Sequence, residues 1–158
     1  MTMHTIQLES IGACIPELQE IIKTHWKELA LFKDKAPLDP QWELYKAREA
    51  RGECIFVTCR VEGRIVGYVC AFMAYGLHYR QTLTVHMDVI FVVPEFRNKG
   101  WVIKMLDFAV AEYRRRGANV CYMGSKQASS LHPGLDRVYR SRGFEPVDLY
   151  YGLWLTEK

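Results

Sequence analysis

Three segments rich in β-branched and aromatic residues follow one another between residues 54 and 93, and they dictate a sheet. Residues 54–61 and 64–75 flank the dipeptide Glu62-Gly63, which is typical of a two-residue hairpin turn. Residues 82–93 are the third segment, which stops at Pro94 because proline cannot donate to a central ladder. The sequence therefore predicts a meander of three strands.

Helical patterns precede and follow this meander. The expected elements outside it are helices over 14–33 and 42–50, a helix between Gly100 and Gly117, a strand over 118–124, a helix over 131–142 and a last strand over 149–155. This order predicts an α/β fold, with a mixed and mostly antiparallel central sheet covered by helices on both faces. At 158 residues, the chain is expected to be a single domain over 1–158.

Composition narrows the class of protein. Five cysteines, an odd number, lie mostly inside apolar stretches, which favours reduced thiols and a cytoplasmic location. The chain has neither a run of 18 apolar residues nor a signal-peptide pattern at its start, so no membrane partner is expected. The net charge of +3 is too mild to indicate nucleic acid. The basic excess lies after residue 94, where it suits a compact polyanion.

The segment from Val92 to Val102 carries the most chemical information. A strand leads through a short basic loop into a helix, whose first N–H groups lack intrahelical acceptors and whose dipole is positive. Gly100 removes a Cβ, and Arg97 and Lys99 add charge, so the loop suits a pyrophosphate. It matches neither the P-loop nor the dinucleotide glycine motif. An ordinary loop with solvated charges is the alternative.

Two motifs resemble those of the GNAT family of N-acetyltransferases. Arg97-Asn98-Lys99-Gly100-Trp101-Val102 is similar to its Arg-x-x-Gly-x-Gly/Ala motif, and Tyr139-Arg-Ser-Arg-Gly143-Phe144 to its Tyr-x-x-x-Gly-Phe signature. The element order also matches over nearly the whole chain, most closely in small acetyltransferases carried by bacteriophages. The chain departs from the family at Val102, where a small residue is usual, at His132, where asparagine is frequent, and at Trp101, which is bulky.

The resemblance implies acetyl-CoA as co-substrate and a splayed strand pair that binds it. The backbone of Ile90, Phe91 and Val92 would pair with the pantetheine arm, and the Val92 N–H would face the thioester carbonyl. The pyrophosphate would lie against Arg97, Asn98, Lys99, Gly100, Trp101 and Val102, and His132 would reach the cofactor from the next helix. Whether the Val102 side chain crowds the phosphates stays open.

The resemblance also implies direct attack of a primary amine on the thioester in a ternary complex. Asp88 and His86 match positions where the family places the base, or a residue that orders its water. A period of two would put residues 86, 88, 90 and 92 on one face. The alternative for Asp88 is a salt bridge to a neighbouring strand. His86, nearer the strand end, fits either role.

Tyr139 matches the family's general acid, which protonates the coenzyme A thiolate. Its alternative role is a core aromatic beside Leu135 and Val138. No cluster of ligand spacing predicts a metal. The pattern of Arg114-Arg115-Arg116 is typical of a solvated helix end. Cys121 is interpreted as an inert residue of the packed interior.

The resemblance implies an amine-bearing small molecule, a protein or a peptide as acceptor. Residues 14–53 carry nearly equal acidic and basic charge, which favours neither a polycation nor an anion. A homodimer is compatible with the sequence. The alternative function is a catalytically degenerate coenzyme A-binding or protein-interaction domain of the same fold.

Overall fold

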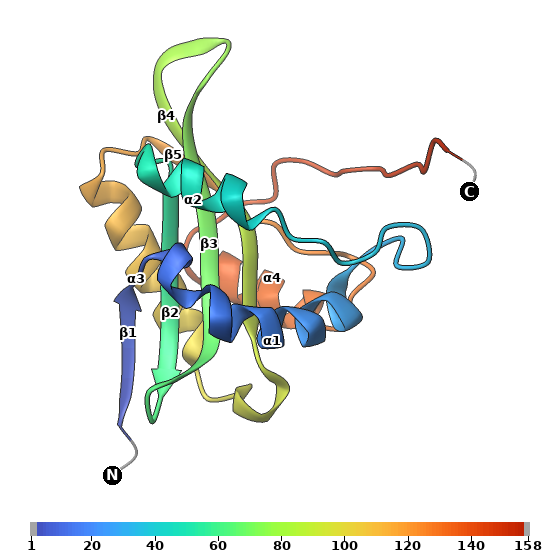
Figure 1. The fold of residues 1–158 in the computed structure, drawn as a ribbon. Coiled ribbons are helices and arrows are strands. Elements are labelled where there is room, and N and C mark those ends of the chain that lie inside the picture. Colours follow the sequence, from blue (N-terminus) through green and yellow to red (C-terminus); the bar gives the residue numbers. More distant parts are fainter. Residues whose placement is uncertain (1–2, 157–158) are drawn as a thin grey trace.

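A computed structural model describes residues 3–156 and shows one mixed sheet of five strands in the order of the chain (Figure 1). The strands are β1 His4–Leu8, β2 Cys54–Val61, β3 Arg64–Gly76, β4 Tyr79–Val92 and β5 Val120–Tyr122. Neighbours from β1 to β4 are antiparallel, and β5 runs parallel to β4. The mixed and mostly antiparallel sheet predicted from the sequence is confirmed.

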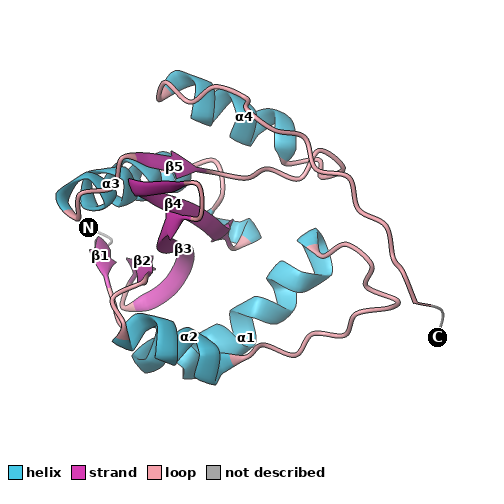
Figure 2. Ribbon diagram, turned by 90° about the horizontal axis from the view of Figure 1, so that it is seen from above, coloured by secondary structure: helices cyan, strands magenta, loops and turns pink. Residues whose placement is uncertain are grey.

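Helices cover both faces of this sheet, as expected (Figure 2). The helices α1 Ile11–Leu29 and α2 Trp42–Ala50 lie on one face, and α3 Trp101–Arg115 and α4 His132–Ser141 lie on the other. One core packs α1 residues such as Leu18 against Phe56 and Tyr68, and the second packs Met105 and Ala109 of α3 against the opposite face. None of the helices among residues 3–156 is long and apolar enough to cross a membrane. All five cysteines are free, and four are buried.

Two elements differ from those expected from the sequence: helix α1 begins earlier, and strand β1 was not expected. Helix α1 starts at Ile11 rather than residue 14, because the Ser10 hydroxyl caps it by accepting from the Ala13 N–H at 3.3 Å. The Glu49 carboxylate of α2 also accepts from the Ile11 N–H at 2.7 Å, which fixes α1 against α2. Strand β1 is an additional edge strand on β2, and its five residues are too few to give a clear period.

The strand predicted over 149–155 is wrong: residues 144–156 have no regular secondary structure. The segment runs away from the sheet past the loop after α1, where Trp154 packs on Phe32 with ring centroids 5.8 Å apart (Figure 1). Tyr151 stays 90% exposed. A strand needs a partner edge as well as β-forming residues, and β5, the last strand of the sheet, is only three residues long.

Close packing of β3 on β4 and α3 depends on Gly67. A Cβ there would lie 3.0 Å from the Phe91 carbonyl oxygen and 3.1 Å from the Met105 methyl carbon. We expect Gly67→Ala to lower the free energy of unfolding by about 2–3 kcal/mol in urea titrations, because neither the β4 backbone nor the packed core can move away freely. Gly134→Ala is the control, because its Cβ would meet open space in α4. Equal stability of the two variants would contradict this packing.

Candidate active site

A fork between β4 and β5 dominates one edge of the sheet. Strand β4 pairs with β5 only over residues 84–86, whereas it pairs with β3 as far as Val92. The Val93 N–H donates to the Val66 carbonyl of β3 at 2.9 Å, so the N–H and C=O of Val92 point to the opposite, open edge. The same alternation exposes the backbone of Ile90 there and turns that of Phe91 toward β3. The splayed strand pair expected from the sequence is therefore present, but the Phe91 backbone does not line it.

A β-bulge at Asp88 changes which side chains share a face. Cys70 pairs with Val89 and Ala71 with Met87, so Asp88 is the extra residue on β4. As a result His86 and Asp88 lie on the α1–α2 face, while Ile90 and Val92 pack into the core beneath α3. The prediction that residues 86, 88, 90 and 92 share one face is wrong, because the bulge shifts the period by one residue.

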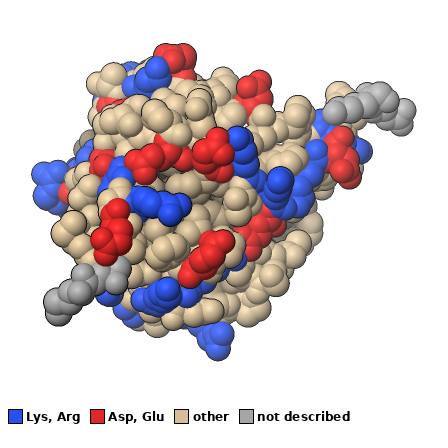
Figure 3. All heavy atoms as spheres, turned by 60° about the horizontal axis from the view of Figure 1, so that its bottom comes forward, with Lys and Arg blue, Asp and Glu red and all other residues tan. Residues whose placement is uncertain are grey.

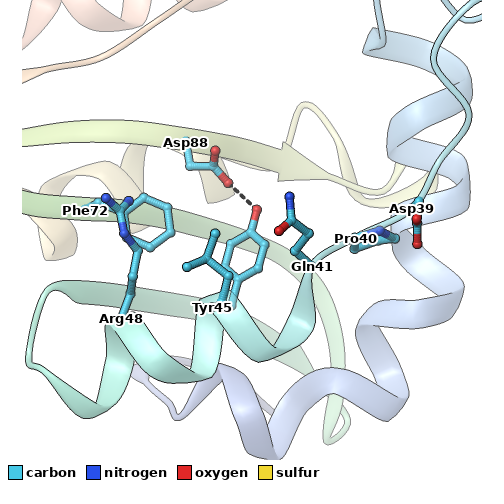
Figure 4. A pocket seen from close by; sticks show the side chains of 8 residues that line it. Asp39, Pro40, Gln41, Tyr45, Arg48, Phe72 and Asp88 are labelled. Atoms are coloured by element: carbon cyan, nitrogen blue, oxygen red, sulfur yellow. Dashed lines mark hydrogen bonds between the residues drawn. The ribbon is translucent and has the colours of Figure 1, made fainter.

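Asp88 lies at a cavity of about 350 Å³ between α2 and the sheet (Figure 4). The Tyr45 hydroxyl donates a 2.7 Å hydrogen bond to Asp88 Oδ2, and burial together with this bond raises the pKa of Tyr45. Asp88 makes no ion pair with any residue between 3 and 156, so the structural role of a salt bridge does not apply. The cavity lining is completed by Asp39, Pro40, Gln41, Leu44, Arg48 and Phe72.

Aromatic and charged groups shape the rest of this cavity. The Arg48 guanidinium lies over the Phe72 ring, 4.4 Å from its centroid, and also lies 3.6 Å from the Glu53 carboxylate. Asp39 and Asp88 are thus the two carboxylates of the lining, and the one guanidinium is already engaged. Such a site suits a small cationic group.

His86 lies apart from the open edge. Its ring stacks on Tyr122 of β5 at 5.1 Å, and its side chain is exposed. Six residues separate it from Val92, which corresponds to roughly 20 Å along a strand. The structure therefore brings His86 near Asp88 but not near the backbone groups of Ile90 and Val92.

Tyr139 reaches the fork from α4. Its hydroxyl donates to the Gly124 carbonyl at 3.0 Å and lies 3.6 Å from Met87 Sδ. The side chain is buried, and burial raises the pKa of the phenol. Met87 directly precedes Asp88 on β4. The Tyr139 hydroxyl, beside the Met87 side chain, and the Asp88 carboxylate therefore lie at consecutive residues of β4, on opposite faces of the sheet.

The loop before α3 presents a row of free N–H groups. Within residues 3–156, the backbone N–H groups of residues 98–103 find no protein acceptor. Asn98 and Gly100 both have positive φ, 60° and 77°, which turns the chain sharply into α3. Val102 packs against the core rather than standing free in the loop. Successive N–H groups at a helix N-terminus form an anion site.

The side chains of this loop point elsewhere. Trp101 packs on His4 of β1 at 4.9 Å, and the Lys99 ammonium lies 5.0 Å from the Phe96 ring centroid. Arg97 donates through Nε to the Val92 carbonyl at 2.9 Å and through both Nη atoms to the Glu28 carboxylate. The charge of Arg97 is therefore paired with Glu28 in this structure. His132, at the start of α4, shares a 2.9 Å hydrogen bond with the Ser125 hydroxyl.

Several residues around the site carry no sequence signal. Tyr45 and Glu28 lie on helices, where an exposed polar position looks the same whether it faces solvent or a partner. His25 of α1 stacks on Phe91 at 4.9 Å, and its Nδ1 lies 2.9 Å from the Tyr68 hydroxyl. Burial lowers the pKa of His25 to about 4, so it is neutral at physiological pH. Only the fold reveals these contacts.

Surface charge is mixed rather than segregated. Figure 3 shows basic and acidic side chains interspersed over the face that it presents. Arg115 and Arg116, the end of the basic run, both pair with Glu112, at 2.7 and 2.6 Å. These pairs lower the pKa of Glu112 to about 2. The run thus has the structural role expected for a charged helix end.

Comparison with known proteins agrees with this geometry. A family model described as "Acetyltransferase (GNAT) family" matches residues 16–144. No match was found among curated protein sequences. The fold is similar to aminoglycoside acetyltransferase HMB0005 from an uncultured soil metagenomic sample, with 13% identity, a TM-score of 0.77 and coverage of 98% of this chain and 99% of that chain.

Two further solved structures share the fold. A ribosomal-protein-alanine N-acetyltransferase from Brucella melitensis biovar Abortus 2308 is 14% identical, with a TM-score of 0.72 over 98% of this chain and 100% of that chain. A protein from Clostridium acetobutylicum described as a predicted acetyltransferase, solved with acetyl-CoA, is 15% identical, with a TM-score of 0.68 over 96% of each chain. At these identities the likeness concerns the fold alone.

Proposed function

Because this chain belongs to the acetyltransferase (GNAT) family, we propose that its N-acetyltransferase reaction takes place at the fork between β4 and β5. One observation carries the proposal. The Asp88 carboxylate and the Tyr139 hydroxyl, which lies beside Met87, are placed at consecutive residues of β4 on opposite faces of the sheet. An acceptor can then approach from the α1–α2 face while the acetyl donor enters from the α3–α4 side.

The residues on the donor side fit acetyl-CoA, the co-substrate of the family. The free N–H groups of residues 98–103 suit its diphosphate, and the open edge of β4 offers backbone partners to its pantetheine arm. When bound, acetyl-CoA supplies the acetyl group as an activated thioester. His132 is a further candidate contact, through the ring nitrogen that does not face Ser125.

Geometry favours the Ile90 N–H, rather than that of Val92, as the donor to the thioester carbonyl oxygen. Both groups face the open edge, but Ile90 is two residues nearer to Asp88 and to the Tyr139 hydroxyl, a difference of about 7 Å. A preorganised N–H at this place stabilises negative charge as it develops on the oxygen. The Val92 N–H would then receive the pantetheine arm.

Asp88 is proposed as the base for the acceptor amine. Such an amine has a pKa of ~10.4 and is almost fully protonated at pH 7, so it must lose a proton before it attacks. The Tyr45 hydrogen bond fixes the Asp88 carboxylate, which faces the open cavity. With two carboxylates and a volume of about 350 Å³, the cavity supports a small cationic amine over a folded protein as acceptor. We assign His86 no direct role.

Tyr139 is proposed as the acid for the leaving thiolate. Its raised pKa keeps the phenol protonated, and the hydroxyl lies beside Met87 at the fork. The hydroxyl has a single proton, now donated to the Gly124 carbonyl, so donation to sulfur requires only a turn about the C–O bond.

Binding and turnover test this proposal. Acetyl-CoA at about 100 times its Kd should stabilise the protein by about 2.7 kcal/mol, which raises Tm by roughly 5–10 °C. Release of free thiol, followed with a panel of diamines, polyamines, aminoglycosides and amino-terminal peptides, should then identify the acceptor. No stabilisation at millimolar acetyl-CoA would overturn the proposal.

Two glycines with the same backbone strain provide a matched pair of variants. Gly100 and Gly117 have φ of 77° and 82°, and a Cβ on either would meet open space within the protein. Gly100→Ala should abolish most of the shift in Tm by acetyl-CoA, because the methyl group occupies the site of the diphosphate. Gly117→Ala, at the other end of α3, should lower Tm equally and keep the shift.

A further inference from the structure

The Arg97 side chain lies across the open edge of β4. Its Nε donates to the Val92 carbonyl at 2.9 Å, and the guanidinium lies 5.4 Å from the Phe91 ring centroid. Both Nη atoms bind the carboxylate of Glu28 in the last turn of α1. The Arg97 and Glu28 side chains are 20% and 30% exposed, so the pair lies at the surface but is partly covered by the protein.

A second cation ties the same turn of α1 to the other arm of the fork. Lys126, in the segment after β5, donates through Nζ to the Leu29 carbonyl. The consecutive residues Glu28 and Leu29 of α1 are thus bound to the loop that follows β4 and to the loop that follows β5, respectively. The end of α1 therefore bridges the two loops that border the fork.

The position of Arg97 conflicts with the path proposed for acetyl-CoA. The free N–H groups of residues 98–103 and that of Ile90 lie on either side of Val92 along the chain. A pantetheine arm that joins them must pass the Val92 carbonyl, which Arg97 already occupies. Arginine binds carboxylate and phosphate with the same bidentate geometry. Because Arg97 directly precedes Asn98, a side-chain rotation can move its guanidinium from Glu28 to a phosphate group.

From these contacts we infer that Glu28 competes with the diphosphate of acetyl-CoA for Arg97, and so acts as a positioning residue that holds the cleft closed in the absence of co-substrate. The inference rests on the proposed function. The Arg97 hydrogen bonds lower the pKa of Glu28, so the carboxylate competes as an anion at neutral pH. Released Glu28 is near enough to the surface to be hydrated, which makes the exchange of partners reversible.

Calorimetric titration with coenzyme A tests the competition. Glu28→Gln keeps the size of the side chain and removes its charge, so it should lower the Kd for coenzyme A threefold to tenfold. Glu20→Gln on the same helix is the matched control, because Glu20 is 76% exposed and pairs with the neighbouring Lys23 at 2.8 Å. The control should leave the Kd within twofold of the wild type, which removes the change in net charge as an explanation.

A merely structural role gives the opposite result. If the pair only supports the shape of the loop, Glu28→Gln should raise the Kd or leave it unchanged, and either outcome overturns the inference while the proposed function stands. An equal gain in the Glu20→Gln control would also overturn it, because net charge would then be the cause. Absence of coenzyme A binding to the wild type would overturn both proposals.

Discussion

Tyr139→Phe should lower kcat by roughly 10²–10⁴-fold and leave the Kd for acetyl-CoA unchanged. The hydroxyl lies at the fork, and as an acid it acts on the leaving sulfur only as the C–S bond breaks. Its loss therefore removes stabilisation of the transition state and none of the ground state. Steady-state turnover with any accepted amine, together with calorimetric Kd values, measures the two quantities separately.

The stability of this variant serves as its internal control. Phenylalanine keeps the ring contact with Phe144, whose centroid lies 5.5 Å away, and loses the hydrogen bond to the Gly124 carbonyl and the contact with Met87 Sδ. We expect a loss of about 1 kcal/mol in the free energy of unfolding, the usual value of one such bond. Full turnover in Tyr139→Phe would leave the tyrosine a packing role and assign the proton to water.

Asp88→Asn should lower kcat about a hundredfold near pH 7 and less than tenfold near pH 9.5. The direction of this pH dependence follows from the protonation state of the acceptor amine. Below its pKa of ~10.4 the amine is charged and needs a base, and its neutral fraction rises about tenfold with each pH unit. The variant should therefore show a log rate that climbs with pH while the wild type levels off. The pH–rate profiles of the two proteins measure this difference.

Tyr45→Phe is the comparison for Asp88→Asn. It removes the hydrogen bond to Asp88 Oδ2 but leaves the carboxylate in place, so we expect a loss of only threefold to tenfold at all pH values. Parallel pH profiles for wild type and Asp88→Asn would show that the carboxylate binds the acceptor without removing its proton. In that case the effect should appear in KM instead of kcat.

Much of the fold was predictable because its elements carry strong local patterns. The bounds of β2 and α2 agree with those expected from β-branched content and from the break at Gly52. The last strand could not be judged from its own residues, since pairing depends on an available edge elsewhere in the chain. Strand β1 was missed for the related reason that its identity comes from β2, about 50 residues later.

Candidate site residues could be proposed from the sequence one by one, but their arrangement in space could not. Asp88 and Tyr139 follow from their places beside two family motifs. The bulge that turns Asp88 away from Ile90 adds one residue to β4 without any turn or glycine to mark it. The pairing of Arg97 with Glu28 joins residues 69 positions apart, and a charge pattern along the sequence contains no information on such a contact.

The bulge at Asp88 also divides the molecule into two parts that can be redesigned independently. The lining of the cavity comes mainly from α2 and the segment before it, whereas the free N–H groups belong to α3 and the loop before it, and the open edge to the end of β4. Substitutions at Leu44, Arg48 or Phe72 should therefore alter the shape of the proposed acceptor cavity without changing the residues proposed to bind the donor. A library confined to those three positions should yield enzymes with new acceptors and an unchanged affinity for acetyl-CoA.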